Sequence, residues 1–268
     1  DLGFKTGNVH SAVPVHVKGH VQPDFILECE KEVVIDKNIE DATVRAGSDI
    51  MINGGIRGMK SRIYSPSDVR VSFIENASIY LNGRLIVSGS IINSTVASND
   101  TIIVGDEKTR HSMVVGGEII VNKYLEVSEL GSDAYVKTIV RLGVSQEDRR
   151  AILLIDKELE EINEKLERVN QTAYHHKMTP KDDTKKVMFN LAIVKNALLK
   201  KHVALDEKKN TILEQLKQSD AGKVVIKKCV FPGVIVFIND CFNKVNTRLG
   251  PGSFVFNKER NSVDFIAD

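Results

Sequence analysis

The hexapeptide Ile74-Glu-Asn-Ala-Ser-Ile79 decides how this sequence folds, because two other stretches repeat it closely. Residues 39–44 read Ile-Glu-Asp-Ala-Thr-Val, and residues 91–96 read Ile-Ile-Asn-Ser-Thr-Val. After a turn-like stretch, each copy is followed by a short run of strand-forming residues. These runs are residues 49–52, 84–87 and 101–104.

The short strands recur with a nearly constant period. Their starts at Val33, Ile50, Val69, Leu85, Ile102 and Ile119 are 17, 19, 16, 17 and 17 residues apart. A period near 17, built from very short strands and turns, is typical of a β-solenoid, in which each coil buries its apolar residues against the next. We therefore expect a single-stranded parallel β-solenoid, wound as a right-handed β-helix. A β-sandwich is the alternative, but it has no reason to repeat the hexapeptide.

Asparagines also recur one period apart, which supports stacked coils. Asn76 and Asn93 are 17 residues apart, and so are Asn82 and Asn99. Identical polar side chains one coil apart can stack as a ladder, so we expect these pairs to lie above one another.

Residues 146–220 have a helical texture, with no Gly and with Pro180 as the only Pro. Apolar residues at 152, 155, 159, 162, 166 and 169 follow a spacing of 3 and 4, which predicts a helix from 146 to about 171. Thr179 and Pro180 are typical of a helix start, and a second apolar series predicts a helix over 181–218, about 55 Å long.

The two predicted helices carry opposite net charges. The first has 5 basic and 8 acidic residues, and the second has 9 basic and 5 acidic residues. Attraction between them favours an antiparallel coiled-coil hairpin with a turn of about eight residues. Two helices lying flat on a globular body are the alternative.

Residues 221–268 return to short strands, such as 223–226 and 253–256. We expect them to extend or cap the solenoid, because an open sheet edge invites pairing with other chains. The predicted organisation is a β-solenoid over 1–145, a helical hairpin over 146–220 and C-terminal strands over 221–268.

The composition argues against two broad classes of protein. The 268 residues include 37 Lys and Arg against 36 Asp and Glu, whereas a general nucleic-acid binder normally carries a strong basic surplus. The sequence contains no run of about 18 apolar residues, so it predicts no transmembrane helix. The chain begins at Asp1 without Met or a leader, so we expect a fragment or a processed product.

The cysteines and glycines suggest structural roles. Cys29, Cys229 and Cys241 have no metal-like spacing, and their odd number fits a reducing compartment. A disulfide bond between Cys229 and Cys241 is the alternative. The cluster Gly54-Gly55-Ile56-Arg57-Gly58 and the pair Gly116-Gly117 could cradle a phosphate with their backbone amides. Tight solenoid corners that need glycine at positive φ account for both clusters, so we expect no cofactor.

Among the histidines, His10, His16 and His20 could converge on a metal, but strand alternation turns His16 to solvent, so we expect no metal site. Hexapeptide-repeat acyltransferases also build a solenoid from Ile-Glu-x-x-Thr-like hexads and carry a catalytic His in a loop, which would be His111 here. The hexads do not propagate, because Arg45 and Tyr80 stand where an aliphatic residue should recur. This family is therefore the enzyme alternative, and we expect no catalytic residue.

Four residues near the predicted hairpin tip are candidates for binding a protein partner. They are Tyr174, His175, His176 and Met178. An exposed tip with an aromatic ring, a thioether and two imidazoles can contact another protein, and a solvated turn is the alternative.

Several motifs follow one another along nearly the whole chain. They are Gly-Gly-Ile-Arg-Gly at 54–58, Ile-Ile-Asn-Ser-Thr-Val at 91–96, Gly-Gly-Glu-Ile at 116–119, Leu-Gly-Ser at 130–132, Thr-x-x-x-Leu-Gly at 138–143, a charged coiled coil, and Phe-Pro-Gly-Val-Ile-Val at 231–236. This order of motifs resembles the flagellar assembly protein A family of bacteria. Members typically carry a further N-terminal domain. The resemblance implies no enzymatic activity; at least one branch is associated with polar flagellar assembly and with binding a component of the sugar phosphotransferase system.

We therefore expect a non-enzymatic bacterial scaffold, cytoplasmic and located at the cell pole, that binds protein partners and forms a homo-oligomer. A self-assembling cytoskeletal β-solenoid of the bactofilin kind is the alternative function, because an uncapped coil tends to polymerise.

Overall fold

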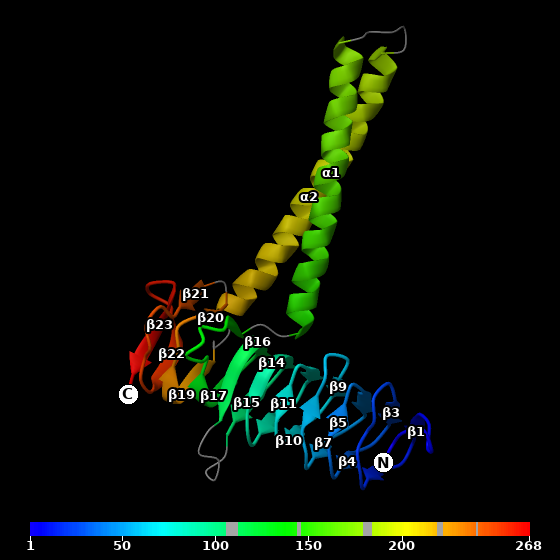
Figure 1. The fold of residues 1–268 in the computed structure, drawn as a ribbon. Helices are drawn as coiled ribbons and strands as arrows, with labels where there is room; N and C mark the ends of the chain where they lie inside the picture. The colour runs from blue at the N-terminus through cyan, green and yellow to red at the C-terminus, as the bar shows by residue number, and fades with distance from the viewer. Residues whose placement is uncertain (106–111, 144–145, 179–183, 219–221, 240) are drawn as a thin grey trace. The chain divides into compact units, whose positions relative to one another are not determined.

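The computed structural model describes residues 1–105, 112–143, 146–178, 184–218, 222–239 and 241–268 (Figure 1). The chain divides into two compact units. The solenoid unit comprises Asp1–Gln146 and Ser219–Asp268, and the hairpin unit comprises Glu147–Gln218.

The solenoid unit is built from parallel ladders in which each coil adds one strand, as the repeat predicts. Ladder A contains β1 (Val9–Ser11), β3 (Ile26–Cys29), β6 (Thr43–Ala46), β9 (Arg62–Ser65), β12 (Ser78–Leu81), β14 (Ile91–Ser98), β16 (Met113–Val121), β18 (Thr138–Leu142) and β20 (Val234–Ile238). Ladder B contains β2 (Val15–Val17), β4 (Val33–Ile35), β7 (Ile50–Ile52), β10 (Val69–Val71), β13 (Leu85–Val87), β15 (Thr101–Val104), β17 (Tyr124–Leu130) and β19 (Lys223–Val230). Ladder C contains β5 (Ile39–Glu40), β8 (Ile56–Arg57), β11 (Ile74–Glu75) and the first residues of β14 and β16. The predicted parallel β-solenoid is confirmed, and the hand of the coil stays a prediction.

The repeated hexapeptide spans ladders C and A in register. Ile74 pairs with Ile56 and Ile91, and Ile79 pairs with Ile63 and Val96. These side chains belong to columns of buried aliphatic residues that run along the coils, each at most 1% exposed. The columns are Val21, Ile39, Ile56, Ile74, Ile91 and Val114 on ladder C, Leu27, Val44, Ile63, Ile79, Val96, Ile119, Val140 and Val236 on ladder A, and Val33, Ile50, Val69, Leu85, Ile102, Leu125 and Val224 on ladder B. Each side chain contributes about 1.5–3 kcal/mol of hydrophobic free energy only when coils lie on both sides of it.

The third residue of the hexapeptide forms the corner between ladders C and A. Asp41, Gly58, Asn76, Asn93 and Gly116 follow one another in register, with φ of 43°, 103°, 52°, 46° and 70°. This left-handed conformation suits Gly, Asn and Asp and is costly for other residues. Asn76 and Asn93 therefore lie one coil apart at the same corner, as predicted. Asn99 donates a side-chain hydrogen bond to Asn82 Oδ1 at 3.0 Å, which confirms the predicted ladder for that pair.

The explanation by positive φ holds for Gly58, Gly116 and Gly117 but was wrong for Gly54 and Gly55. At Gly55, a Cβ atom would overlap the ring of Phe73 on the next coil. At Gly54, a Cβ atom would lie 2.7 Å from the backbone of Lys37 on the preceding coil. These two glycines are small so that neighbouring coils can approach, and not because the backbone turns left-handed.

The prediction that the strand at Ile119 continues the ladder B series was wrong. Ile102 pairs with Leu125, and Ile119 pairs with Val96 on ladder A. The extra length enters between Gly105 and Ser112, and residues 106–111 lie outside the described residues. Strands of similar length and composition recur on each ladder, so an interval of 17 could not show that the series had moved to another face.

The C-terminal strands reverse the chain direction at the end of the solenoid. β19 and β20 add a last parallel coil, and then β22 (Gly252–Asn257) and β21 (Cys241–Lys244) pair with them antiparallel. β23 (Ser262–Ala267) pairs with β22, and the ring of Phe254, which is fully buried, lies 4.9 Å from that of Phe265. A further parallel coil would need the edges that β21 and β22 occupy, so this end is covered.

The hairpin unit consists of α1 (Gln146–Met178) and α2 (Thr184–Gln218), which pack together. The predicted end of the first helix near residue 171 was wrong, because no Gly or Pro occurs before Pro180 to stop it. The predicted second start at 181, with Thr179 and Pro180, lies outside the described residues. Three residues of the predicted apolar series are buried, namely Ile155, Leu159 and Ile162.

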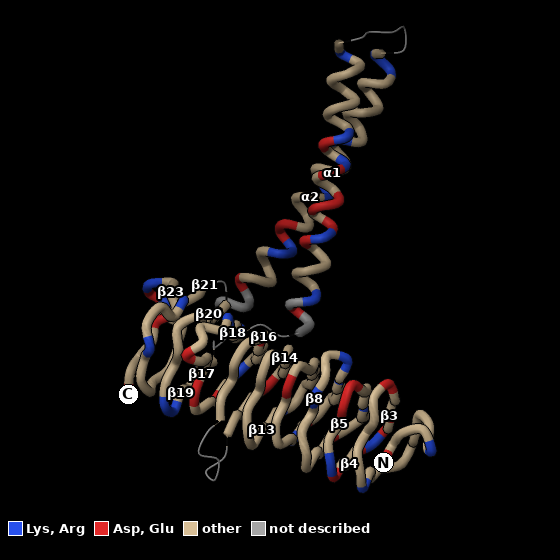
Figure 2. The backbone as a smooth tube through the Cα atoms, viewed as in Figure 1, with Lys and Arg blue, Asp and Glu red and all other residues tan. Residues whose placement is uncertain are grey.

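Ion pairs between the helices follow the predicted charge difference. Lys209 of α2 lies 2.7 Å from Asp156, and Lys201 lies 3.1 Å from Glu158, both acids of α1. Figure 2 shows acidic and basic residues along both helices. Asp156, near the start of α1, meets Lys209, near the end of α2, so the helices are antiparallel. Exposed pairs of this kind are each worth less than about 1 kcal/mol, so the apolar contacts carry most of the packing.

The corner column generates a first prediction. Asn76→Gly should change the free energy of unfolding by less than about 0.5 kcal/mol, whereas Asn76→Val should lower it by about 2 kcal/mol, because a β-branched residue resists positive φ. Denaturant unfolding followed by circular dichroism measures both values. Glu75→Val, one residue earlier on a strand, is the control, and a loss there as large as that of Asn76→Val would contradict the explanation.

The separation of the two units generates a second prediction. The described residues of the main apolar core all belong to the solenoid unit. Replacing residues 147–218 by a short Gly/Ser linker should therefore shift the melting temperature of the solenoid by less than about 3 °C. Scanning calorimetry of both chains tests this, and a drop of more than about 10 °C would show that the hairpin holds the solenoid together.

Candidate interaction surfaces

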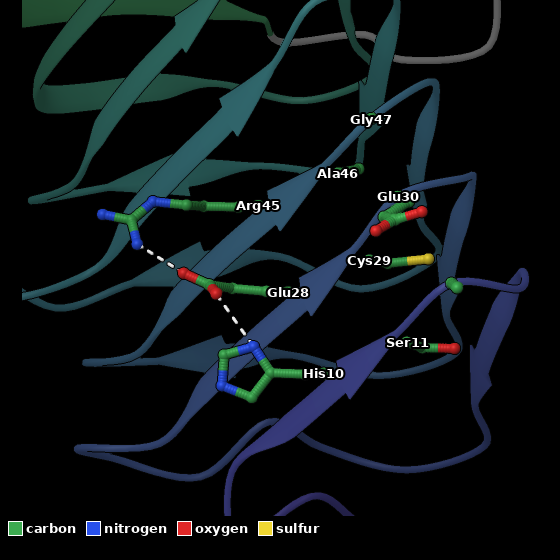
Figure 3. A pocket seen from close by; sticks show the side chains of 9 residues that line it. His10, Ser11, Glu28, Cys29, Glu30, Arg45, Ala46 and Gly47 are labelled. Atoms are coloured by element: carbon green, nitrogen blue, oxygen red, sulfur yellow. Dashed lines mark hydrogen bonds and ion pairs between the residues drawn. The ribbon is translucent and has the colours of Figure 1, made fainter.

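The outward side chains of ladder A form a row in which each residue contacts the next coil. His10 Nδ1 lies 2.9 Å from Glu28 Oε2, and Arg45 Nη1 donates a hydrogen bond to Glu28 Oε1 at 2.6 Å (Figure 3). The strand register sets this row, because His10 pairs with Glu28 and Glu28 pairs with Arg45. The hydrogen bond from Arg45 is the main reason why the pKa of Glu28 lies below its ordinary value, so the carboxylate stays charged near neutral pH.

The row continues as an aromatic stack. The Arg45 guanidinium lies 5.1 Å from the ring centre of Tyr64, and the rings of Tyr64 and Tyr80 stack 5.4 Å apart with 15° between their planes. A cation over an aromatic face and an offset ring pair both restrict rotamers. We call these five residues, His10, Glu28, Arg45, Tyr64 and Tyr80, the ladder A row.

A shallow hollow of about 470 Å³ lies beside this row, at the edge of ladder A. It is lined by His10, Ser11, Ala12, Glu28, Cys29, Glu30, Arg45, Ala46 and Gly47. The Cys29 thiol is buried and donates to the Val13 carbonyl oxygen at 3.2 Å, so its proton is already engaged. A mixed-charge hollow of this kind can accept side chains of a protein partner.

A second polar row stands near the C-terminal end of ladder A. Arg141 Nε donates to Glu118 Oε1 at 2.7 Å, and its guanidinium lies 4.2 Å from the ring centre of Phe237. Phe237 in turn contacts the ring of Phe242, which is 62% exposed. This second row also combines a cation with aromatic rings, and the Arg141 side chain contacts both Glu118 and Phe237.

Ladder B presents a more apolar outward row. Val34, Met51, Arg70, Ile86 and Ile103 follow one another in register. Met51 is 42% exposed, and Arg70 is the only charged member of these five. Outward aliphatic residues on a flat parallel sheet offer contact area to another protein.

The candidate tip residues lie on the last turns of α1. Tyr174 is 64% exposed and Met178 is 61% exposed, four residues apart on the same side of the helix. His175 is exposed, His176 is half-buried, and their ring centres are 6.3 Å apart. The four residues are thus helical and are not part of a turn, because α1 continues through Met178, and their role in binding a partner stays a prediction.

The three N-terminal histidines lie apart from one another. His16 is exposed, as its strand position predicts, and its Nε2 lies 2.9 Å from Asp36 Oδ1. His20 Nδ1 accepts a hydrogen bond from the Asn38 backbone at 3.3 Å. Within the part of the chain that the structure describes, no three His, Cys, Asp or Glu side chains come together as metal ligands.

The cysteines are all free thiols. Cys229 is buried beside Arg248 Nη2 at 3.5 Å, whereas the Cys241 thiol donates to the Asn261 carbonyl oxygen at 3.0 Å. Cys229 and Cys241 are therefore not joined in this structure. His111, which the acyltransferase alternative requires, lies outside the described residues.

Sequence reasoning missed the ladder A row, although the period could have found it. Glu28, Arg45, Tyr64 and Tyr80 are spaced 17, 19 and 16 residues apart, close to the intervals between strand starts. Their side chains differ in type, so no repeated letter drew attention to them. Register, and not residue identity, brings them together.

The ladder A row generates a third prediction. Arg45→Gln should raise the pKa of Glu28 toward its ordinary value, because it removes the main hydrogen bond to the carboxylate. Because folding lowers the pKa of Glu28, the hydrogen bond from Arg45 stabilises the folded state fully above the unfolded-state pKa of Glu28. This stabilisation is lost as the pH falls through the folded-state pKa. The stability difference between wild type and Arg45→Gln should therefore shrink in acid. Carboxyl-carbon NMR titration measures the pKa, and Arg62→Gln, on the same ladder, should leave it unchanged.

Comparison with known proteins adds one finding to this geometry. A family model described as the Flagellar Assembly Protein A beta solenoid domain matches residues 1–262. Searches of curated proteins and of solved structures found no match. No helix among the described residues combines the length and apolar character needed to cross a membrane. Because the family model spans nearly all of its 268 residues, the chain belongs to the flagellar assembly protein A family.

Proposed function

We propose that this chain is a non-enzymatic scaffold for flagellar assembly in a bacterial cytoplasm, acting at the cell pole. It binds protein partners, among them a component of the sugar phosphotransferase system, and associates with copies of itself. The observation that carries the proposal is the family match over residues 1–262, which covers both units.

The arrangement of outward side chains supports a scaffold. In the ladder A row, each side chain is restrained by the coil above or below it, through the Glu28–Arg45 hydrogen bond and the Tyr64–Tyr80 stack. A partner that binds such a row meets side chains that are already ordered, so little rotamer entropy is lost on binding. Rigid surfaces with mixed charge and aromatic rings suit protein recognition.

The acyltransferase alternative receives less support. In that family the aliphatic hexad positions point into the core, whereas Arg45 and Tyr80, six residues after Ile39 and Ile74, point outward in the ladder A row. A coil of this chain is therefore shorter than three hexads. Its residues six positions after Ile39 and Ile74 also point outward instead of into the core.

The bactofilin-like alternative also receives less support. A filament of stacked coils needs both ends of the solenoid open, whereas β21 and β22 run antiparallel along the last coil. This favours a discrete particle over a polymer. The formal net charge of +1 likewise favours protein partners over nucleic acid.

Genetic complementation gives a fourth prediction. Cells that lack the native protein should have fewer flagella, and the full-length gene carrying wild type or His111→Ala in this region should restore them equally, because the proposed function needs no catalytic His. Filament counts by electron microscopy measure this. Normal flagella without the protein would contradict a role in assembly, and failure of a folded His111→Ala protein would favour the enzyme.

Direct binding tests the proposed partner. The purified chain should bind the phosphotransferase-system component in a calorimetric titration, and acetyl-CoA, titrated in parallel, should give no heat. Binding of acetyl-CoA that His111→Ala abolishes would reverse the conclusion. Repeating the titration with residues 147–218 replaced by a linker assigns the partner to the solenoid unit or to the hairpin unit.

A further inference from the structure

The side of α2 opposite to Val187, Leu191, Val194 and Leu198, which begin the apolar series that predicts this helix, carries exposed apolar side chains. Phe189 is 66% exposed, Ile193 53%, Leu199 42% and Val203 55%. At 100° per residue, these four lie on the side of α2 opposite to Leu198, which is half-buried. We call Phe189, Ile193, Leu199 and Val203 the outer stripe.

The outer stripe includes a shallow groove. Leu199, Lys200, Val203, Ala204 and Glu207 line a hollow of about 330 Å³. Large apolar residues that recur at exposed positions of one helix face are typical of a contact surface, since single scattered ones would not align.

The outer stripe is symmetric about Asn196. Phe189 and Val203 stand seven residues to either side of it, and Ile193 and Leu199 stand three residues to either side. The charges continue the pattern, because Lys185 and Glu207 are both exposed and stand eleven residues to either side.

This symmetry indicates that the outer stripe is covered by a second copy of the chain. A two-fold axis at Asn196 lays α2 of a second copy antiparallel on the first, so that each residue faces the one equally far on the other side of the axis. Phe189 then meets Val203, Ile193 meets Leu199, and Lys185 meets Glu207. A parallel arrangement would instead place Lys185 against Lys185, which is unfavourable. We propose that two copies of this chain dimerise through the outer stripe of α2, antiparallel about Asn196.

The length of the contact along α2 indicates how strongly the two copies should associate. Residues 185–207 extend over about 33 Å of helix, so the contact falls at the small end of specific interfaces. We therefore expect a reversible dimer whose population depends on concentration, and not a permanent one. This inference rests on the self-association in the proposed function and adds its surface and orientation.

Sedimentation equilibrium of the full chain tests the dimer and gives a fifth prediction. Ile193→Asp should weaken association at least about tenfold, because it places a charge in the apolar centre of the contact. Leu154→Asp is the matched control, since Leu154 is 63% exposed on α1 and should leave association unchanged. A monomer at every concentration, or a dimer that Ile193→Asp does not weaken, would overturn the proposal.

Charge exchange tests the orientation. Lys185→Glu and Glu207→Lys should each weaken the dimer, and the double variant should restore it, because both are exposed and opposite charges meet again. In a Cys241→Ser background, Asn196→Cys should form a disulfide-linked dimer on oxidation and Asn190→Cys should not. Absence of restoration together with equal crosslinking would refute the antiparallel arrangement. Flagellar counts are independent of these readouts, so the dimer can fail while the proposed function stands.

Discussion

The solenoid unit depends on one constraint, namely that successive coils stack parallel and in register. A coil alone leaves its inward Ile, Leu and Val side chains in water, and they become buried only between neighbouring coils. The register in turn depends on a corner residue that accepts positive φ, supplied by Asp41, Gly58, Asn76, Asn93 and Gly116. A residue of another type at this corner strains the backbone locally, whereas a one-residue slip in register would turn every following side chain of that strand to the other face.

The same register organises the surface. Side chains that share a position in successive coils lie above one another, so Glu28 meets Arg45 and Tyr64 meets Tyr80 without any local sequence signal. At the C-terminal end, the parallel stacking continues until the chain changes direction. β21 and β22 make that change at the C-terminal end. The hairpin unit follows different rules, with a buried apolar series on one side of α1, interhelical ion pairs, and an exposed apolar stripe on α2.

Most of the fold could be predicted because its signals repeat. The hexapeptide, the 17-residue period and the apolar series of α1 each depend on local periodicity, and each corresponds to a buried column or to a buried side of a helix. The errors occurred where the period is interrupted. The interval to Ile119 indicates the wrong ladder because extra residues after Gly105 happen to preserve it, and the predicted end of α1 is too early because its apolar series weakens after Val169 although α1 continues to Met178.

The sequence by itself determined the class of fold, the order of the two units and the opposite charges of the helices, since these follow from residue types at short, regular spacings. Only the tertiary structure decided which residues share a surface. Gly54 and Gly55 are small because coils approach closely, and the ladder A row exists because strands pair in register. These are contacts between residues that are distant along the chain or on different coils, and no local pattern specifies which atoms will meet.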